Sequence, residues 1–137
     1  MTERIIDTGP LVALLVGDDH SHAWAVEQSK EAPPVVLTCE AVISEALFLL
    51  KRDGHESDDL FGLVEVGFLR VRFDFHEEYV RVRELMRRYR DRPMSYADAC
   101  LVRMAELHQG ASVWTLDGDF QFYRMHRKQA LTLRVPR

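Results

Sequence analysis

Two aspartates follow apolar runs at positions where catalytic or metal-binding carboxylates commonly lie. Asp7 comes directly after Ile5 and Ile6 and precedes a turn, and Asp117 follows the run VWTL at 113–116 and opens another turn. In parallel α/β sheets, functional side chains gather at the carboxyl ends of the strands. Aspartate also favours turns and helix N-termini, so each residue alone supports a structural and a functional role about equally.

Glu45 lies in the middle of a segment with helical spacing. The residues one turn away on either side are Ala41, Val42, Phe48 and Leu49. This pattern predicts a carboxylate that faces the core, where an unpaired charge is costly or shifts its pKa. A nearby cation would relieve that cost, so the position favours a functional role for Glu45.

Asp98 stands near the start of another predicted helix, three residues after Ser95. A serine followed at that distance by an acid is typical of a capping box. Leu101 and Val102, one turn further on, place the same carboxylate on the apolar side of the helix. A capping role and a ligand role therefore both stay open.

The acids described above, with Asp119 close to the last of them, are predicted to converge at one rim of a sheet: Asp7, Glu45, Asp98 and Asp117. Carboxylates packed together repel one another unless a cation neutralises them. The histidines and cysteines lack the spacing of a zinc site, and an all-oxygen pocket suits Mg²⁺ or Mn²⁺. Such ions, with a substrate phosphate completing their coordination, support hydrolysis of phosphodiester bonds.

Strand-like and helix-like segments alternate along the chain and would position these acids. Short apolar or β-branched runs predict strands at 4–6, 35–38, 69–73, 112–115 and 131–135. Helical spacing between them predicts helices at roughly 10–16, 21–31, 40–52, 57–67, 76–90, 96–108 and 120–125. This alternation predicts an α/β fold with a central, mostly parallel sheet and helices on both faces. Trp24 and Trp114 are expected to be packing residues, and Phe122 and Tyr123 are expected to pack the short helix after the last acidic motif.

Length and composition restrict the class of protein. A chain of 137 residues with 47% hydrophobic and 29% charged residues is typical of a soluble globular protein, and we expect one domain over residues 1–137. No apolar run approaches the ~18 residues of a membrane span, and the N-terminus lacks a signal-peptide pattern. Cys39 and Cys100 stand alone, which predicts a reducing, cytoplasmic setting. The net charge of −4 argues against a general nucleic-acid coat protein.

A basic segment between residues 81 and 92 is the candidate surface for a phosphate backbone. Its apolar members follow helical spacing and are predicted to be buried: Val82, Leu85, Met86 and Tyr89. Arg83, Arg87 and Arg90 then share an exposed face. Arg83, Arg87 and Arg92 are the candidate substrate contacts, because arginine suits phosphate geometry. The alternative is a solvated charged face, as predicted for Glu84 among its neighbouring arginines.

Taken together, the acidic motifs resemble those of PIN-domain ribonucleases. The matching segments are IIDT at 5–8, Thr38 followed by Glu45, MSYADA at 94–99 and TLDGDF at 115–120. Their order and spacing, from about Ile5 to Tyr123, are most similar to the VapC-type toxins of toxin–antitoxin pairs.

This resemblance implies a three-layer α/β/α fold with four to five strands, and metal-dependent endoribonuclease activity. It assigns Mg²⁺ or Mn²⁺ to the acidic positions already singled out, namely Asp7, Glu45, Asp98 and Asp117. Asp119 matches a further acidic position, and Thr8 and Thr115 match hydroxyls beside the pocket. Family members commonly form homodimers, act on RNA and are inhibited by a small antitoxin.

Other functions stay open on the residues alone. A housekeeping nuclease, or a non-catalytic PIN-like module that binds RNA or protein, would have the same fold. In the second case the acids would be helix caps or solvated residues. An aspartyl-phosphate phosphatase would use Asp7 as the nucleophile, but such enzymes have a second aspartate where this chain has Gly9.

Overall fold

The computed structural model describes residues 2–136 of the chain. Its centre is a five-stranded sheet in the order β3-β2-β1-β4-β7, and every adjacent pair of strands is parallel. The strands are β1 (Arg4–Ile6), β2 (Val36–Thr38), β3 (Leu69–Val71), β4 (Ser112–Trp114) and β7 (Thr132–Arg134). The predicted α/β class and parallel sheet are confirmed, and the strand ends differ from the expected ones by at most two residues.

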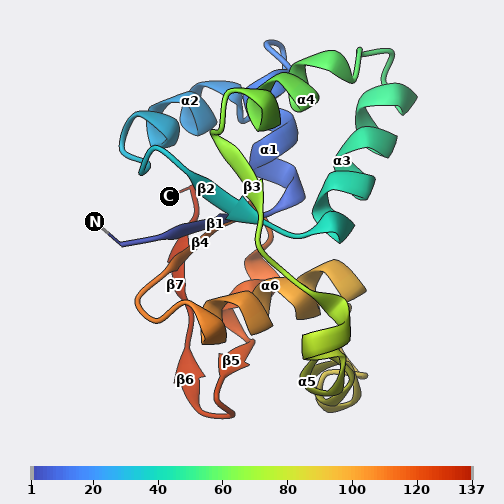
Figure 1. Ribbon diagram of the computed structural model, residues 1–137, viewed down its shortest axis with the longest axis vertical. Helices are drawn as coiled ribbons and strands as arrows, with labels where there is room; N and C mark the ends of the chain where they lie inside the picture. The colour runs from blue at the N-terminus through green and yellow to red at the C-terminus, as the bar shows by residue number, and fades with distance from the viewer. Residues whose placement is uncertain (1, 137) are drawn as a thin grey trace.

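Helices pack on both faces of this sheet. They are α1 (Thr8–Leu15), α2 (His22–Lys30), α3 (Glu40–Arg52), α4 (Asp58–Glu65), α5 (Phe75–Arg88) and α6 (Tyr96–Leu107). The helices α1 to α4 lie on one side and α5 and α6 on the other, which confirms the predicted three layers (Figure 1). Across residues 2–136, every helix is too short or too polar to cross a lipid bilayer.

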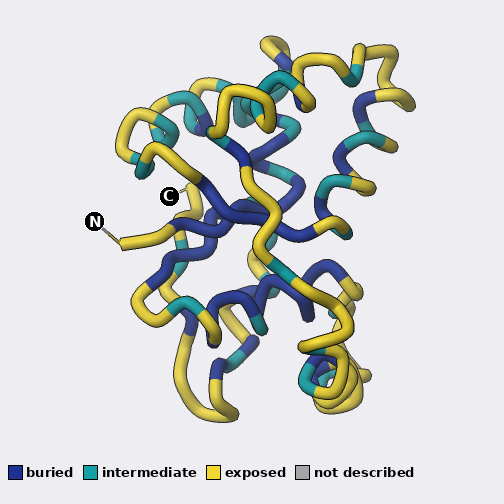
Figure 2. The backbone as a smooth tube through the Cα atoms, in the orientation of Figure 1, coloured by how far each residue is buried: buried dark blue, intermediate teal, exposed yellow. Residues whose placement is uncertain are grey.

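The middle strands and α6 form the centre of the hydrophobic core, drawn in dark blue in Figure 2. Ile5, Ile6 and Val113 are completely buried. The rings of Trp24 and Trp114 meet edge to face with centroids 6.4 Å apart, which confirms their packing roles. Because strands covered on both faces leave no room for water, polar side chains that bind ligands are confined to the strand ends.

The segment after Asp117 differs from the expected helix at 120–125. A short 3₁₀ helix covers Gly118–Gln121, and an antiparallel hairpin of β5 (Arg124–Met125) and β6 (Gln129–Ala130) follows. In the hairpin turn, His126 and Arg127 have positive φ angles, a backbone conformation that residues other than glycine rarely adopt. Contacts with residues distant in the sequence stabilise this turn, so local periodicity could not predict it.

Those contacts centre on Glu106, a carboxylate of α6 whose side chain is completely buried. Glu106 accepts two hydrogen bonds from Arg81 of α5, at 3.0 and 2.8 Å, and one from the backbone N–H of His126 at 2.6 Å. Arg103 donates a fourth at 3.2 Å. Burial opposes ionisation of this group, but the bonds from Arg81 and His126 hold the pKa of Glu106 below its ordinary value. Glu106 therefore ties α5 and the hairpin to α6.

Candidate active site

The carboxyl ends of β1 and β4 open into an acidic pocket of about 400 Å³. Its lining includes the acids predicted to converge, namely Asp7, Glu45, Asp98 and Asp117. They come from the end of β1, the middle of α3, the start of α6 and the end of β4. The sheet thus brings together side chains that are far apart in the sequence, as expected for an α/β fold.

Asp7 is held in place on both sides. Its Oδ1 accepts the backbone N–H of Thr8 at 2.7 Å, which caps α1, and its Oδ2 accepts the hydroxyl of Thr115 at 2.7 Å. The same Thr115 oxygen accepts the N–H of Asp117 at 2.9 Å. Thr115 therefore orients two of the acids, which is the supporting position predicted for its hydroxyl.

The electrostatics of the pocket are those of crowded carboxylates. Burial raises the pKa of Asp7 to about 6, although the bonds from Thr115 and Thr8 oppose this, and the charges of Asp98 and Asp117 raise it further. Burial, and after it the charge of Asp117, likewise raises the pKa of Asp98. Among residues 2–136, none of the acids lining the pocket forms a salt bridge with lysine or arginine. Within those residues, the acids of the pocket have no cationic side chain as a partner.

The structure shows the capping role that the sequence left open for Asp98. It forms a capping box with Ser95, in which each residue accepts the backbone N–H of the other. Its Oδ2 also accepts the hydroxyl of Tyr123 at 3.2 Å. Tyr123 is buried against the rings of Tyr89 and Phe120, so the expected packing role is confirmed, but the contact with Asp98 was missed. Burial and the Asp98 carboxylate raise the pKa of Tyr123, which keeps the phenol protonated and donating.

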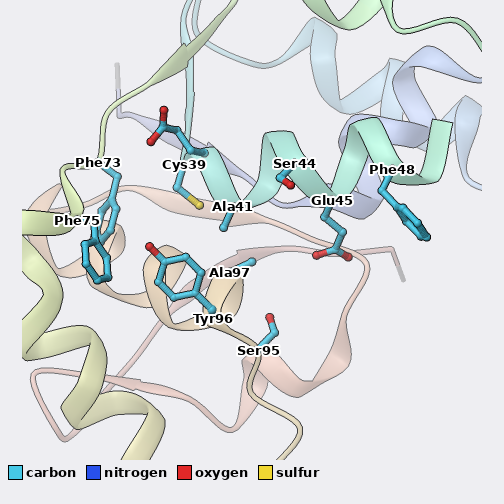
Figure 3. A pocket seen from close by; sticks show the side chains of 11 residues that line it. Cys39, Ala41, Ser44, Glu45, Phe48, Phe73, Phe75, Ser95, Tyr96 and Ala97 are labelled. Carbon is cyan, nitrogen blue, oxygen red and sulfur yellow. The ribbon is translucent and has the colours of Figure 1, made fainter. Parts of the chain in front are cut away.

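Glu45 does not face the core as the spacing predicted. The buried stripe of α3 is formed by Val42, Ala46 and Leu50, whereas Glu45 is exposed. The prediction was wrong because it counted Phe48 as a core neighbour, and Phe48 is itself 64% exposed. In Figure 3 the carboxylate of Glu45 points from α3 toward the segment that carries Ser95, across the open side of the pocket.

The remaining acidic and basic candidates lie outside the lining of the acidic pocket. Asp119 is outside its lining and donates its N–H to Oδ1 of Asp117 at 2.9 Å. The guanidinium of Arg92 lies 4.2 Å above the ring centroid of Phe122. Arg83 and Arg87 are exposed on α5, as predicted, but Met86 between them is 37% exposed and was wrongly expected to be buried. Its side chain lies in a hollow between the arginines instead of in the core.

The donor set fits a hard divalent cation. The pocket offers carboxylate and hydroxyl oxygens, and Oγ1 of Thr8 is buried without a hydrogen-bond partner. In residues 2–136, no group of three or more His, Cys, Asp or Glu side chains is arranged to hold a metal as it stands. Several oxygens are turned to local donors, as at Asp7 and Asp98. Binding a cation would therefore require these side chains to reorient.

Comparisons with known proteins agree with this geometry. The family model of the PIN domain matches residues 4–128. The fold is similar to the crystal structure of Mycobacterium tuberculosis VapC20, a sarcin-ricin loop cleaving toxin, with a TM-score of 0.74 and 25% sequence identity. The similarity covers 85% of this chain and 92% of that one. No curated protein matches the sequence.

Proposed function

This chain belongs to the PIN-domain family, and from that premise we propose that it is a metal-dependent endoribonuclease, the toxin of a type II toxin–antitoxin pair. The observation that carries the proposal is the pair of buried carboxylates without a cationic partner in the described chain, Asp7 and Asp98, in a pocket that also contains Asp117 and Glu45. A substrate phosphate adds further negative charge. A divalent cation bound between the carboxylates and the phosphate would neutralise both.

Asp7, Asp98 and Asp117 would hold the cation, with Glu45 reaching it from the open side and Asp119 supporting Asp117. When bound, Mg²⁺ or Mn²⁺ supplies activation of water and stabilisation of the leaving oxygen in phosphodiester hydrolysis. The hydroxyls of Thr115 and Tyr123 fix the carboxylates of Asp7 and Asp98.

The substrate and partners follow from the family. VapC20 is a sarcin-ricin loop cleaving toxin, and we propose RNA as the substrate of this chain, with Arg83, Arg87 and Arg92 as phosphate contacts. A small antitoxin, a homodimer and a cytoplasmic location are further parts of the proposal. The pocket gives no support to the phosphatase alternative, because a Cβ at Gly9 would lie 3.1 Å from Cδ1 of Leu116. That packing leaves no room for a second aspartate without a rearrangement.

Cleavage of a mixed RNA pool tests the activity. We expect wild-type protein to cleave in Mn²⁺ and to stop when EDTA is added. Asp7→Asn keeps a side chain that caps helices well, so it should fold and lose more than about 100-fold in rate. Asp18→Asn, which changes an exposed loop acid, is the matched control. Cleavage that persists in Asp7→Asn, or in EDTA, would defeat the proposal.

A further inference from the structure

The β5–β6 hairpin and the end of α5 beside it carry a group of basic side chains. We call this group the basic hairpin surface, and its members are Arg88, Arg92, Arg124, Arg127 and Lys128. Arg124 is half-buried and the others are exposed. In Figure 1 the hairpin projects from the lower end of the molecule, below α6. Of these residues, only Arg92 has been given a role above.

Contacts between the segments show that these cations share one surface. Nη2 of Arg88 donates a hydrogen bond of 2.8 Å to the backbone oxygen of Arg127. The guanidinium of Arg92 lies over the ring of Phe122, two positions before Arg124. The end of α5, the turn after it and the hairpin therefore present their charges together.

The charge of this surface is not neutralised from within. Among residues 2–136, none of its five members forms a salt bridge. Glu106, beside the hairpin turn, is buried and already engaged by Arg81. Asp91 in the preceding turn is exposed, and it leaves the surface with a net positive charge. Segment 53–65, which leads into α4 at the upper end of Figure 1, contains acids and no lysine or arginine. The positive charge is thus local in a chain whose net charge is −4.

The backbone of the hairpin turn is fixed in an uncommon conformation. His126 and Arg127 have φ angles of 47° and 72°, and such a conformation persists only when the surrounding structure determines it. The hydrogen bond from the N–H of His126 to Glu106 provides that constraint. Within residues 2–136, the side chains of Arg127 and Lys128 form no hydrogen bond. A fixed turn therefore presents two cations that are free to bind an anion at little cost in order.

The aromatic rings near this surface are not available for stacking. Tyr123 is completely buried against Tyr89, and one face of Phe122 is covered by Arg92. Proteins that bind single strands combine cations with aromatic stacking platforms. Double-stranded RNA is recognised mostly by its shape and through phosphates and 2′-hydroxyls, because its bases are stacked inside. Charge without a free ring therefore favours a paired region.

We propose that the basic hairpin surface binds the phosphate backbone of a double-stranded RNA stem next to the strand that enters the acidic pocket. The inference rests on the proposed function, because it takes that pocket to hold an RNA phosphate. Asp98 and Glu106 are eight positions apart on α6, so at about 1.5 Å per residue the hairpin turn lies roughly 12 Å along the helix from the pocket. The substrate class is thus an RNA with a stem beside the cleaved strand.

Fluorescence anisotropy in EDTA tests the surface without requiring cleavage. The probe is a fluorescein-labelled RNA duplex of about 16 base pairs, compared with one of its strands alone. In Arg127→Asn/Lys128→Gln, asparagine tolerates the left-handed backbone while both charges are lost. We expect the Kd of the duplex to rise about tenfold and the slope of log Kd against log salt to fall by about 2. The Kd of the single strand should stay unchanged.

A matched control separates this surface from total charge. Lys51→Gln/Arg70→Gln removes the same charge from exposed positions of α3 and β3 and should leave the duplex Kd and its salt slope unchanged. Lys128→Gln alone, which leaves the positive-φ residues intact, should reduce the slope by about 1. A merely structural role for these side chains would instead lower the melting temperature and leave the duplex affinity of the folded protein intact.

Three results would overturn the inference. The first is wild-type duplex affinity in both hairpin variants, and the second is an equal loss in the control variant. The third is competition by polyglutamate as effective as that of unlabelled duplex at equal charge, which would assign the surface to an acidic polypeptide. Cleavage in Mn²⁺ is measured separately, so a protein that binds the duplex as expected but cleaves no RNA contradicts the proposed function alone.

Discussion

Thr115 and Asp7 lie 108 positions apart in the sequence and are joined by a buried hydrogen bond of 2.7 Å. Because Thr115 also accepts the N–H of Asp117, one hydroxyl connects the ends of β1 and β4. The positions of Asp7 and Asp117 in the acidic pocket thus depend on Thr115, a residue that need not contact a ligand itself.

Replacing this hydroxyl should therefore reduce activity without removing any carboxylate. For Thr115→Val we expect cation affinity and cleavage rate to fall roughly 10- to 100-fold, because an outer hydrogen bond to a ligand is lost. Thr115→Ser retains the hydroxyl and should retain most of the activity. Metal titrations of both variants measure the difference, and equal affinities would contradict the role assigned to this bond.

Cation binding should also be visible as stability. We expect Mn²⁺ to raise the melting temperature of the wild-type protein, since a ligand that binds only the folded state stabilises it. Asp98→Asn preserves a helix-capping side chain but removes a charge, so the shift should shrink strongly. Asp18→Asn should show the full shift. If Mn²⁺ raises the melting temperature of Asp98→Asn as much as that of the wild type, the ion binds outside the acidic pocket.

The stability of the protein in acid should depend on Glu106. Its pKa is lowered on folding, so its contribution is present above the unfolded value of about 4.3 and is lost as the pH falls through the folded value. Glu106→Gln leaves the mostly buried Arg81 with only the exposed Glu84 as a charged partner and should cost about 3 kcal/mol at neutral pH. Its stability should then change less with pH in the acid range, as urea unfolding at several pH values would show.

Glu84→Gln provides the comparison for that measurement. Glu84 contacts the same arginine at 3.3 Å, but 48% of its side chain is exposed. Solvent screens an exposed pair, so this change should cost less than about 1 kcal/mol. An equal loss of unfolding free energy in Glu106→Gln and Glu84→Gln would show that the burial of Glu106 does not strengthen its ion pair.

A side chain at Gly9, in the lining of the acidic pocket, should crowd Leu116. A Cβ there would lie between 3.1 and 3.3 Å from the side chain of Leu116, which follows β4. Gly9→Ala is therefore expected to destabilise the fold by about 1–3 kcal/mol through overpacking. Gly62→Ala, in α4 where nothing lies within 4 Å, should instead stabilise it slightly. Thermal melts of the two variants distinguish the cases.

Local patterns in the sequence predicted most of the fold. The bounds of β1 and α3 were predicted without error, because an apolar run and a periodic stripe decide such elements on their own. The hairpin after Gln121 was missed because its turn depends on Glu106 and Arg88, which lie far away in the chain.

The candidate site was predicted unevenly for the same reason. Asp7, Asp98 and Asp117 could be placed because each stands at the end of a strand or the start of a helix. Glu45 was placed in the core because periodicity does not reveal which side of a helix borders a cavity. The contact of Tyr123 with Asp98 follows from the hairpin, so no local signal could have found it.

The buried helix α6 carries Asp98 at one end and Glu106 at the other, and Glu106 is bonded to the arginine-rich α5. The proposed cutting centre and the proposed phosphate-binding face are thereby joined through one helix. An RNA threaded across it would be cut at a constant offset from the segment that is gripped, whatever the length of the strand beyond.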